Sequence, residues 1–206
     1  MDANSPNLSA GDLKKAIRAA KRSLLKSVTP EARAAASLAV CGHLRRQPAW
    51  REARSILFYS PLLDELDIQP LIEETLAEGK LAALPRYDPE TGCYGASLIS
   101  GAAVNLSPGQ FGIPEPHPAA PPLPLNQLDF ILVPGLAFDL FGARLGRGRG
   151  FYDRLLAGVR GVKCGLGFDE QIEPELPLET HDILLDCLVA PALGFANRRG
   201  PAVKAV

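Results

Sequence analysis

The stretch "LDFILVPGLAFDLFGARLGRGRGFYDRLL", residues 128–156, predicts an α/β fold, because an apolar run leads through a glycine loop into a helical pattern. The loop 146–150 then lies at the carboxyl end of a strand and at the start of a helix, where backbone N–H groups and the helix dipole favour anions. Its glycines let the backbone approach a ligand closely, and its arginines offer planar sets of donors. A phosphate group is the expected ligand.

This glycine loop matches neither of two familiar phosphate-binding patterns. It lacks the Gly-Lys-Ser/Thr of a P-loop. The spacing Gly146-x-Gly148-x-x-Phe151 breaks the dinucleotide fingerprint at its third glycine. The loop therefore predicts a phosphate site of another kind.

Outward from this stretch, short apolar runs alternate with helical patterns. We predict strands at 55–60, 80–85, 96–100, 128–134, 162–168 and 186–191, and helices at 13–28, 67–79 and 151–158. Another helix begins after Thr29, a good N-cap followed by Pro30, and ends near Gln47. Apolar strands that alternate with helices are typical of a mostly parallel sheet covered by helices. The predicted fold class is α/β.

The first predicted helix carries two stripes. The apolar stripe, which we expect to be buried, consists of Leu13, Ile17, Ala20, Leu24 and Val28. The basic stripe beside it consists of Lys14, Arg18 and Arg22. A basic helical face is usually solvated, and the residues alone favour that interpretation over ligand binding.

The length of 206 residues and the lack of an internal repeat predict a single domain over residues 1–206. The proline-rich segment 114–127 is expected to be an extended surface crossover, since proline excludes helix and central strand; the alternative is a ligand for an SH3-type domain. Residues 197–206 are expected to form a loose tail.

The bulk composition excludes several classes of protein. A net charge of −1 and a pI near 6.3 provide no general attraction for nucleic acid. The four cysteines form no Cys-x-x-Cys pair, which argues against a zinc site or a disulfide framework and favours a cytoplasmic protein. No apolar run is long enough to cross a bilayer. The basic helix 13–28 resembles a mitochondrial presequence, but Asp2 and Asp12 favour a structural helix.

Acidic residues near the predicted sheet edge allow two interpretations each. Asp153, in the first turn of the helix 151–158, could hold Mg²⁺ against phosphate oxygens, although composition favours a simple helix-terminal acid. Asp64, Glu65 and Asp67 follow the strand at 55–60 and either face a ligand or begin the next helix. His117 and His181 have no partner at metal-ligand spacing.

The residues "VPGLAFDLFGARLGRGRGFYDRLL" at 133–156 resemble the signature of the 5-formyltetrahydrofolate cyclo-ligase family. The resemblance extends over nearly the whole chain through "KKAIR" at 14–18, "LPRY" at 84–87, "FGIPEP" at 111–116 and "LPLETHDILLD" at 176–186. It implies the NagB/RpiA/CoA transferase-like fold, which sugar-phosphate isomerases and acyl transferases share.

The resemblance also implies a reaction, its cofactors and its partners. ATP and Mg²⁺ would serve the conversion of 5-formyltetrahydrofolate, with or without a polyglutamate tail, to 5,10-methenyltetrahydrofolate. The formyl oxygen would be phosphorylated, N10 would attack the formyl carbon, and phosphate would leave. No nucleic acid or membrane is expected as a partner, and the protein is expected to be a monomer in the cytoplasm.

Carried over by position, the resemblance implies a role for each matching residue. The residues implied to bind ATP are Lys14, Arg18, Arg144, Gly146, Arg147, Gly148, Arg149, Gly150 and Tyr152. The residues implied to bind the folate substrate are Glu65, Arg147, Phe151 and Tyr152. Arg149 and Tyr152 are the expected catalytic residues, and Asp153 and Asp186 the expected ligands of Mg²⁺.

Two departures from the family pattern leave other functions open. Arg149 stands where many members have lysine or glycine, and Phe151 replaces the first tyrosine of a pair. A noncatalytic homologue that binds folate or nucleotide is therefore an alternative, as is an isomerase or acyl-transferase relative that needs no ATP. A phosphate- or RNA-binding module is disfavoured, because "GRGRG" is short and lies between a strand and a helix.

Overall fold

Strand β7 (Phe130–Pro134), the predicted strand of the opening stretch, lies inside an 8-stranded sheet in the computed structural model, which describes residues 9–100 and 106–198. The strand order is β12-β11-β10-β7-β1-β2-β3-β6. The other strands are β1 (Ser55–Leu57), β2 (Leu81–Asp88), β3 (Cys93–Ile99), β6 (Pro122–Leu123), β10 (Val162–Leu166), β11 (Cys187–Ala190) and β12 (Gly194–Asn197).

The inner strands run parallel, as predicted. Neighbouring pairs from β2 through β1, β7 and β10 to β11 are all parallel. Strands β3, β6 and β12 are antiparallel to their neighbours and lie toward the two edges. The α/β class with a mostly parallel sheet is confirmed, although the sequence did not predict that β2 and β3 form an antiparallel hairpin.

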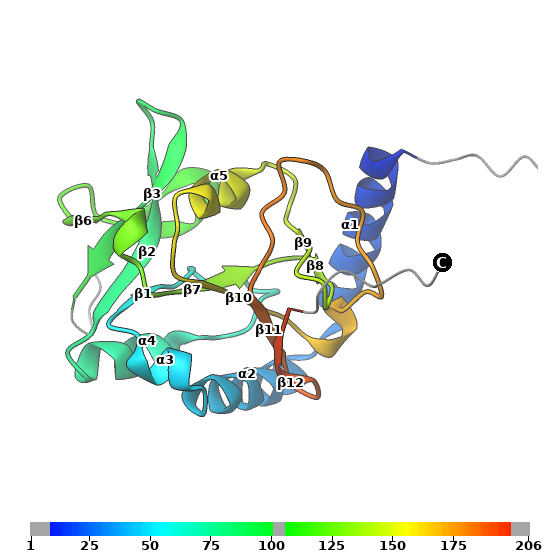
Figure 1. Ribbon diagram of the computed structural model, residues 1–206, viewed down its shortest axis with the longest axis horizontal. Helices are drawn as coiled ribbons and strands as arrows, with labels where there is room; N and C mark the ends of the chain where they lie inside the picture. The colour runs from blue at the N-terminus through cyan, green and yellow to red at the C-terminus, as the bar shows by residue number, and fades with distance from the viewer. Residues whose placement is uncertain (1–8, 101–105, 199–206) are drawn as a thin grey trace, which may run out of the picture.

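Helices cover both faces of the sheet (Figure 1). One face packs against α2 (Pro30–Arg45), α3 (Pro48–Glu52) and α4 (Gln69–Ala77), and the other against α5 (Phe151–Ala157). The strands serve both layers because side chains alternate along a strand. In β7, Phe130 and Leu132 join the core cluster of the first face, whereas Ile131 and Val133 join that of the second.

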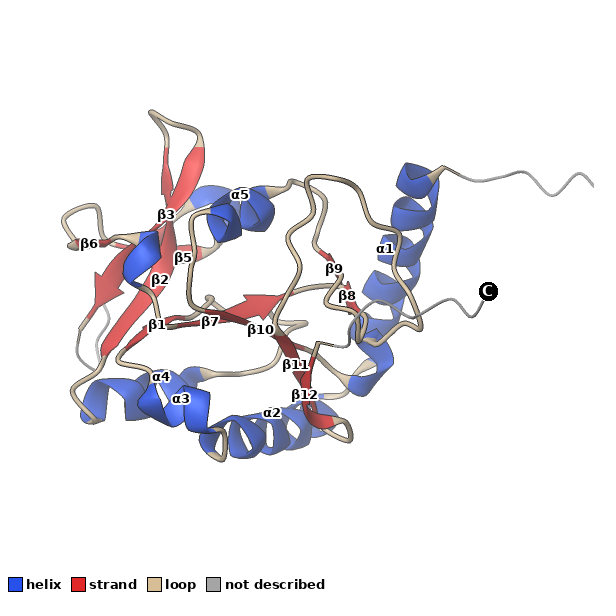
Figure 2. Cartoon of the chain, in the orientation of Figure 1, coloured by secondary structure: helices blue, strands red, loops and turns tan. Residues whose placement is uncertain are grey.

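Helix α1 (Ala10–Ser27) stands at one end of the sheet, beside the short hairpin of β8 (Ala137–Phe138) and β9 (Arg144–Leu145) (Figure 2). The sequence did not predict this hairpin, which separates β7 from the glycine loop. It places the loop 146–150 directly after β9 and directly before α5. The loop therefore begins a helix, as predicted, but does not follow the sheet strand itself.

Helix α2 begins where the sequence predicted. The Thr29 hydroxyl accepts a hydrogen bond from the N–H of Ala32 at 3.2 Å, and Pro30 occupies the first turn. Helix α2 ends at Arg45, and the short helix α3, which was not predicted, follows after Gln47.

The proline-rich segment 114–127 has more structure than an extended spacer. It contains β5 (Pro114–Pro116), which pairs with β4 (Leu106–Pro108), the edge strand β6, and a 3₁₀ turn at Leu125–Gln127. Prolines fit here because an edge strand tolerates a missing N–H. The other 3₁₀ turns are Gln110–Gly112 and Asp169–Gln171.

The expected loose tail begins inside a strand, because Asn197 is the last residue of β12 and pairs with Cys187. The rest of that prediction, residues 199–206, lies outside the described residues. Within the described ranges, no helix is both long and apolar enough to cross a membrane.

Candidate functional site

A cavity of about 520 Å³ opens at the carboxyl ends of β1 and β7. Tyr59 and Ser60, which follow β1, and Pro134 and Gly135 at the end of β7 form part of its wall. The sequence-predicted site residues that line it are Lys14, Arg18, Glu65, Arg144, Gly146, Arg147, Gly148, Arg149, Gly150, Phe151, Tyr152 and Asp153. The structure therefore brings together all of the predicted site residues except Asp186.

The glycine loop is held in place by α1. The side chain of Arg18 donates to the carbonyl oxygen of Gly146 at 3.0 Å, and Arg22 donates to that of Arg147 at 3.0 Å. Gly148 and Gly150 have φ values of 109° and 63°, a region that favours glycine. A Cβ at Gly146 would lie 2.7 Å from Nη1 of Arg144. Backbone conformation thus favours glycine at 148 and 150, whereas a side chain at 146 would have to displace the end of Arg144.

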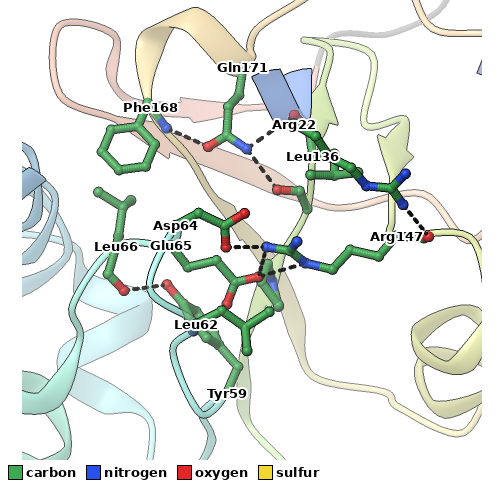
Figure 3. A network of polar contacts seen from close by, with 12 residues as sticks. Arg22, Tyr59, Leu62, Asp64, Glu65, Leu66, Leu136, Arg147, Phe168 and Gln171 are labelled. Carbon is green, nitrogen blue, oxygen red and sulfur yellow. Dashed lines mark hydrogen bonds and ion pairs between the residues drawn. The ribbon is translucent and has the colours of Figure 1, made fainter. Parts of the chain in front are cut away.

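Arg147 links the glycine loop to the loop that follows β1 (Figure 3). Its guanidinium donates to Oδ1 of Asp64 at 2.6 Å and to Oε1 of Glu65 at 3.1 Å. Burial raises the pKa of Glu65 above its usual value, although a hydrogen bond from the N–H of Leu62 and the charge of Arg147 act in the opposite direction. Of the two interpretations left open for Asp64 and Glu65, the ligand-facing one fits Glu65, which lines the cavity.

Arg144 is buried beneath the loop and orients its neighbours. Its guanidinium donates to Oδ1 of Asp153 at 3.1 Å and to the carbonyl oxygen of Pro134 at 3.3 Å, and it lies 5.4 Å from the ring centroid of Tyr152. Its Nε has no partner among the described residues. That nitrogen is itself enclosed by protein, so it is the charge of the guanidinium, in a residue that lines the cavity, that suits an anionic ligand.

Aromatic rings form another part of the wall. The ring of Phe151 lies 5.1 Å from that of Tyr94 and 5.8 Å from that of Phe111. The guanidinium of Arg149 stacks over Phe111, at 4.2 Å from the ring centroid. Phe111 is half-exposed at the edge of the cavity. Flat apolar surface and cationic groups thus face the same space.

The basic stripe of α1 is only partly solvated, because Lys14 is buried whereas Arg18 is half-buried and Arg22 is exposed. Lys14 is 5% exposed and Lys21, which lies outside the stripe, is 8% exposed, whereas Leu13, in the expected apolar stripe, is 39% exposed. Nζ of Lys14 pairs with Asp182 at 2.5 Å and with Glu179 at 2.8 Å, and Lys21 pairs with Glu173 at 2.6 Å. The burial of Lys14 could not be predicted from the sequence, because its partners Glu179 and Asp182 lie 165 and 168 residues away along the chain.

The ion pair of Lys14 and Asp182 shifts both groups toward their charged forms. Burial alone would lower the pKa of Lys14, but hydrogen bonds to Asp182 and Glu179 outweigh it and raise that pKa. Burial alone would raise the pKa of Asp182, but the hydrogen bonds from Lys14 and from the N–H of Glu179 outweigh it and lower that pKa.

Replacing Lys14 by methionine should therefore lower the free energy of unfolding by about 2 kcal/mol at pH 7, since Asp182 loses its buried partner. The contribution of Asp182 is present above its ordinary pKa of 3.8 and is lost as the pH falls through the lower folded-state value. That of Lys14 is present below 10.5 and is lost as the pH rises through the higher folded-state value. Urea unfolding at several pH values should show the largest deficit between about pH 5 and pH 9. An equal deficit at about pH 2 would assign the effect to packing instead.

Asp186 does not lie with the other predicted metal ligand. It immediately precedes β11, at the amino end of that parallel strand, and accepts a hydrogen bond from the N–H of Lys163 at 2.9 Å. The cavity opens at the carboxyl ends of the strands, where Asp153 lies. The expectation that Asp153 and Asp186 share one metal is therefore wrong in this geometry.

The cavity instead contains Asp182, from the same C-terminal segment, together with Glu179 and His181. Ligand atoms of these residues lie within 4.8 Å of one another. This corrects the expectation that His181 has no partner at metal-ligand spacing. The adjacent letters "ETHD" at 179–182 were a usable signal, since acids and a histidine within one turn can share a ligand.

Sequence reasoning also missed Tyr94, Phe111 and Glu115 as cavity residues. Phe111 and Glu115 lie within "FGIPEP", which supported the family resemblance without indicating a location. Tyr94 carried no sequence signal, because only the hairpin of β2 and β3 brings it to the cavity.

Comparison with known proteins identifies the same family as the sequence resemblance. The model of the 5-formyltetrahydrofolate cyclo-ligase family matches residues 10–191. A 5-formyltetrahydrofolate cyclo-ligase of Haemophilus influenzae is 33% identical over 84% of this chain and 95% of its own length. The enzyme of that name from Escherichia coli K12 is 32% identical over 81% of this chain and 94% of its own length.

Solved structures are similar over nearly the full chain. The NMR structure of 5,10-methenyltetrahydrofolate synthetase from Aquifex aeolicus has a TM-score of 0.79 and 31% identity, covering 96% of this chain and 97% of that one. The fold is also that of a Mycoplasma pneumoniae structure, with a TM-score of 0.66, 18% identity, and coverage of 89% and 99%. With a family match over most of its length and these relatives, the chain belongs to the 5-formyltetrahydrofolate cyclo-ligase family.

Proposed function

We propose that this protein converts 5-formyltetrahydrofolate and ATP to 5,10-methenyltetrahydrofolate, ADP and phosphate in the presence of Mg²⁺. Family membership supports the folate conversion. The observation that carries the rest is one cavity that gathers the glycine loop, buried cations, carboxylates and aromatic rings. A nucleotide phosphate and a flat folate ring would both find complementary groups within it.

The chemistry explains why ATP is needed. The formyl group is an amide on N5, and ring closure onto N10 requires its oxygen to leave. In the proposed reaction the formyl oxygen attacks the γ-phosphorus of ATP and ADP departs. N10 then attacks the formyl carbon, the C–O bond breaks, and inorganic phosphate leaves with the oxygen while N10 loses its proton.

Arg147 and Arg149 are the residues we assign to the transferring phosphate. A guanidinium stays protonated at any working pH, so each can stabilise spreading negative charge but cannot act as a base. Arg149 stacks on Phe111 and makes no ion pair within the described part of the chain, so a phosphate need not displace a carboxylate from it. Arg147 would exchange Asp64 and Glu65 for phosphate, which would leave Glu65 available to the folate.

Lys14 and Arg18 have different roles in this proposal. Lys14 lines the cavity beside two acids and would share its charge with a phosphate. Arg18 donates to the Gly146 carbonyl, so we assign it to the shape of the glycine loop as well as to ATP.

The residues of the cavity fit a magnesium ion. Asp153 and Asp182 both lie in its wall, and the Oδ1 of Asp153 is oriented by Arg144. Mg²⁺ prefers carboxylate oxygens together with water and phosphate. The ion would supply positive charge to the phosphate oxygens. We therefore propose Asp153 and Asp182, rather than Asp186, as its protein ligands.

Replacing Asp182 by asparagine should raise the Mg²⁺ concentration that gives half-maximal activity by about tenfold, since one of two anionic ligands is lost. Asp186→Asn removes the same charge outside the cavity and should leave this concentration within about twofold. Initial rates of methenyl formation over a magnesium titration at saturating ATP measure both. An effect of Asp186→Asn alone would contradict the assignment.

A noncatalytic folate or nucleotide binder is the second candidate, and the departures at Arg149 and Phe151 are what favour it. At position 151 the hydroxyl of the family's tyrosine is missing, and the phenylalanine ring packs edge-on against Tyr94. The assay of ring closure separates the two candidates. An RNA-binding role has little support, because Arg18 and Arg22 hold the carbonyl groups of the glycine loop.

A further inference from the structure

Glu115 is a buried carboxylate in the cavity wall to which nothing above assigns a role. It belongs to β5 and is 6% exposed. It pairs with no cationic side chain within the described residues. Its oxygens instead accept hydrogen bonds from the N–H of Tyr87 at 2.8 Å, the N–H of Gln110 at 3.0 Å and the hydroxyl of Tyr94 at 3.2 Å.

These donors come from three different segments. Tyr87 belongs to β2, Tyr94 to β3, and Gln110 to the turn that carries Phe111. Phe111 has a φ of 62°, which is unusual for a bulky residue and has to be held by its surroundings. The bond from its neighbour Gln110 to Glu115 is such a restraint.

Two of these segments carry aromatic rings of the cavity wall, Tyr94 and Phe111. Their ring centroids lie 5.1 Å and 5.8 Å from that of Phe151 in α5, and the ring of Tyr87 lies 5.3 Å from that of Tyr94. Glu115 thus joins the backbone at Tyr87, the backbone at Gln110 and the Tyr94 hydroxyl. Loss of its hydrogen bonds would release the Phe111 turn and the Tyr94 ring together.

We propose that Glu115 is a positioning residue for the folate substrate: it fixes Tyr94 and the Phe111 turn so that the folate rings meet a preformed aromatic wall. The inference rests on the proposed function for the identity of the ligand. Fixing a wall before binding improves affinity because less freedom is lost on binding. No residue of the glycine loop makes a hydrogen bond to Glu115, and the link between them is the stacking of Arg149 on Phe111. Arg149 keeps its charge when the Phe111 turn shifts, so ATP binding should depend on Glu115 much less than folate binding does.

Substitutions at Glu115 and at the neighbouring Gly109 test this role separately. Glutamine at 115 would turn an NH₂ group toward an N–H donor or the Tyr94 hydroxyl, so one bond is lost and the rest remain. A Cβ at Gly109 would lie 2.3 Å from Cδ of Glu115. Gly109→Ala should therefore displace the carboxylate without replacing any residue of the cavity wall.

The experiment measures KM for each substrate, kcat, and the dissociation constant of 5-formyltetrahydrofolate by calorimetry without ATP. We expect Glu115→Ala and Gly109→Ala to raise KM and the dissociation constant for folate by about tenfold or more, with Glu115→Gln intermediate. KM for ATP should stay within about twofold. Asp88→Asn, which removes a partly exposed acid from the end of β2 at the tip of the β2–β3 hairpin, is the matched control and should change neither.

A purely structural role would lower thermal stability and kcat through loss of active protein but would not raise folate KM alone. Unchanged folate affinity in both alanine variants would therefore overturn the inference, and so would equal increases in both KM values. The calorimetric dissociation constant tests the role of Glu115 independently of the proposed reaction. A wild-type protein that binds folate without converting it still tests Glu115, whereas one that binds no folate contradicts the inference.

Discussion

Replacing Tyr152 by phenylalanine should lower kcat for methenyl formation by about 10²- to 10³-fold, as loss of one preorganised donor to a developing charge does in other enzymes. The ring packs against both core clusters, and phenylalanine retains that packing. Burial raises the pKa of Tyr152, so its hydroxyl stays protonated at neutral pH and can donate to the formyl oxygen but not act as a base. The melting temperature should change by no more than about 2 °C.

The matched control is Tyr59→Phe. Tyr59 also lines the cavity, but its hydroxyl already donates to the carbonyl oxygen of Leu66 at 3.2 Å. This variant should lose about 1 kcal/mol of stability and keep most of its turnover. Steady-state kinetics and thermal unfolding of the two variants separate chemistry from packing. Turnover at the wild-type rate in Tyr152→Phe would remove Tyr152 from the reaction.

Replacing Asp139 by alanine should lower the free energy of unfolding by about 3–5 kcal/mol, the largest loss of stability we expect from one substitution near the site. Asp139 is 3% exposed and lies in the loop between β8 and β9. Its carboxylate accepts hydrogen bonds from the N–H groups of Phe141, Ala143 and Leu176, each at 2.9 Å. Alanine would leave two buried donors and one partly buried donor, that of Phe141, without an acceptor.

Asparagine at the same position provides the graded comparison. Its carbonyl oxygen can keep the bonds from Phe141 and Ala143, whereas its NH₂ group would face the N–H of Leu176. We expect a loss of about 1–2 kcal/mol. Urea denaturation measures both variants. If alanine cost less than about 1 kcal/mol, the carboxylate would not be what holds this hairpin and the glycine loop after it.

The sequence predicted the sheet because its strands are continuous apolar runs. The run 128–134 became the buried strand β7, and its alternate residues serve both core clusters. The apolar runs did not predict the direction of the strands near the edges of the sheet. Residues 96–99 of the predicted strand 96–100 lie in β3, but the pairing of β3 with β2 depends on the tight turn after Asp88 rather than on hydrophobicity.

Most site residues could be placed in advance because they lie within one continuous motif that opens α5. The failures involve partners that are distant in the chain. Lys14 was read as part of a solvated face because nothing near it indicates Asp182. Asp186 was chosen over Asp182 because both belong to one matching segment, and only the structure separates the residue in the cavity from the one at the amino end of β11.

Glu115 illustrates a further limit. Its letters matched a family turn, yet its role depends on donors from β2, β3 and the Gln110 turn that meet only in the folded chain. A residue whose function lies in joining several segments leaves no periodic or local signal. The structure had to supply it.

The central claim is tested most directly by mixing the purified protein with 5-formyltetrahydrofolate, ATP and Mg²⁺ and following the near-ultraviolet absorbance of the methenyl product. The account predicts that absorbance rises only when all components are present, with one ADP formed for each methenyl group. No rise under these conditions, with ATP or folate still bound, would contradict it and favour a noncatalytic binder.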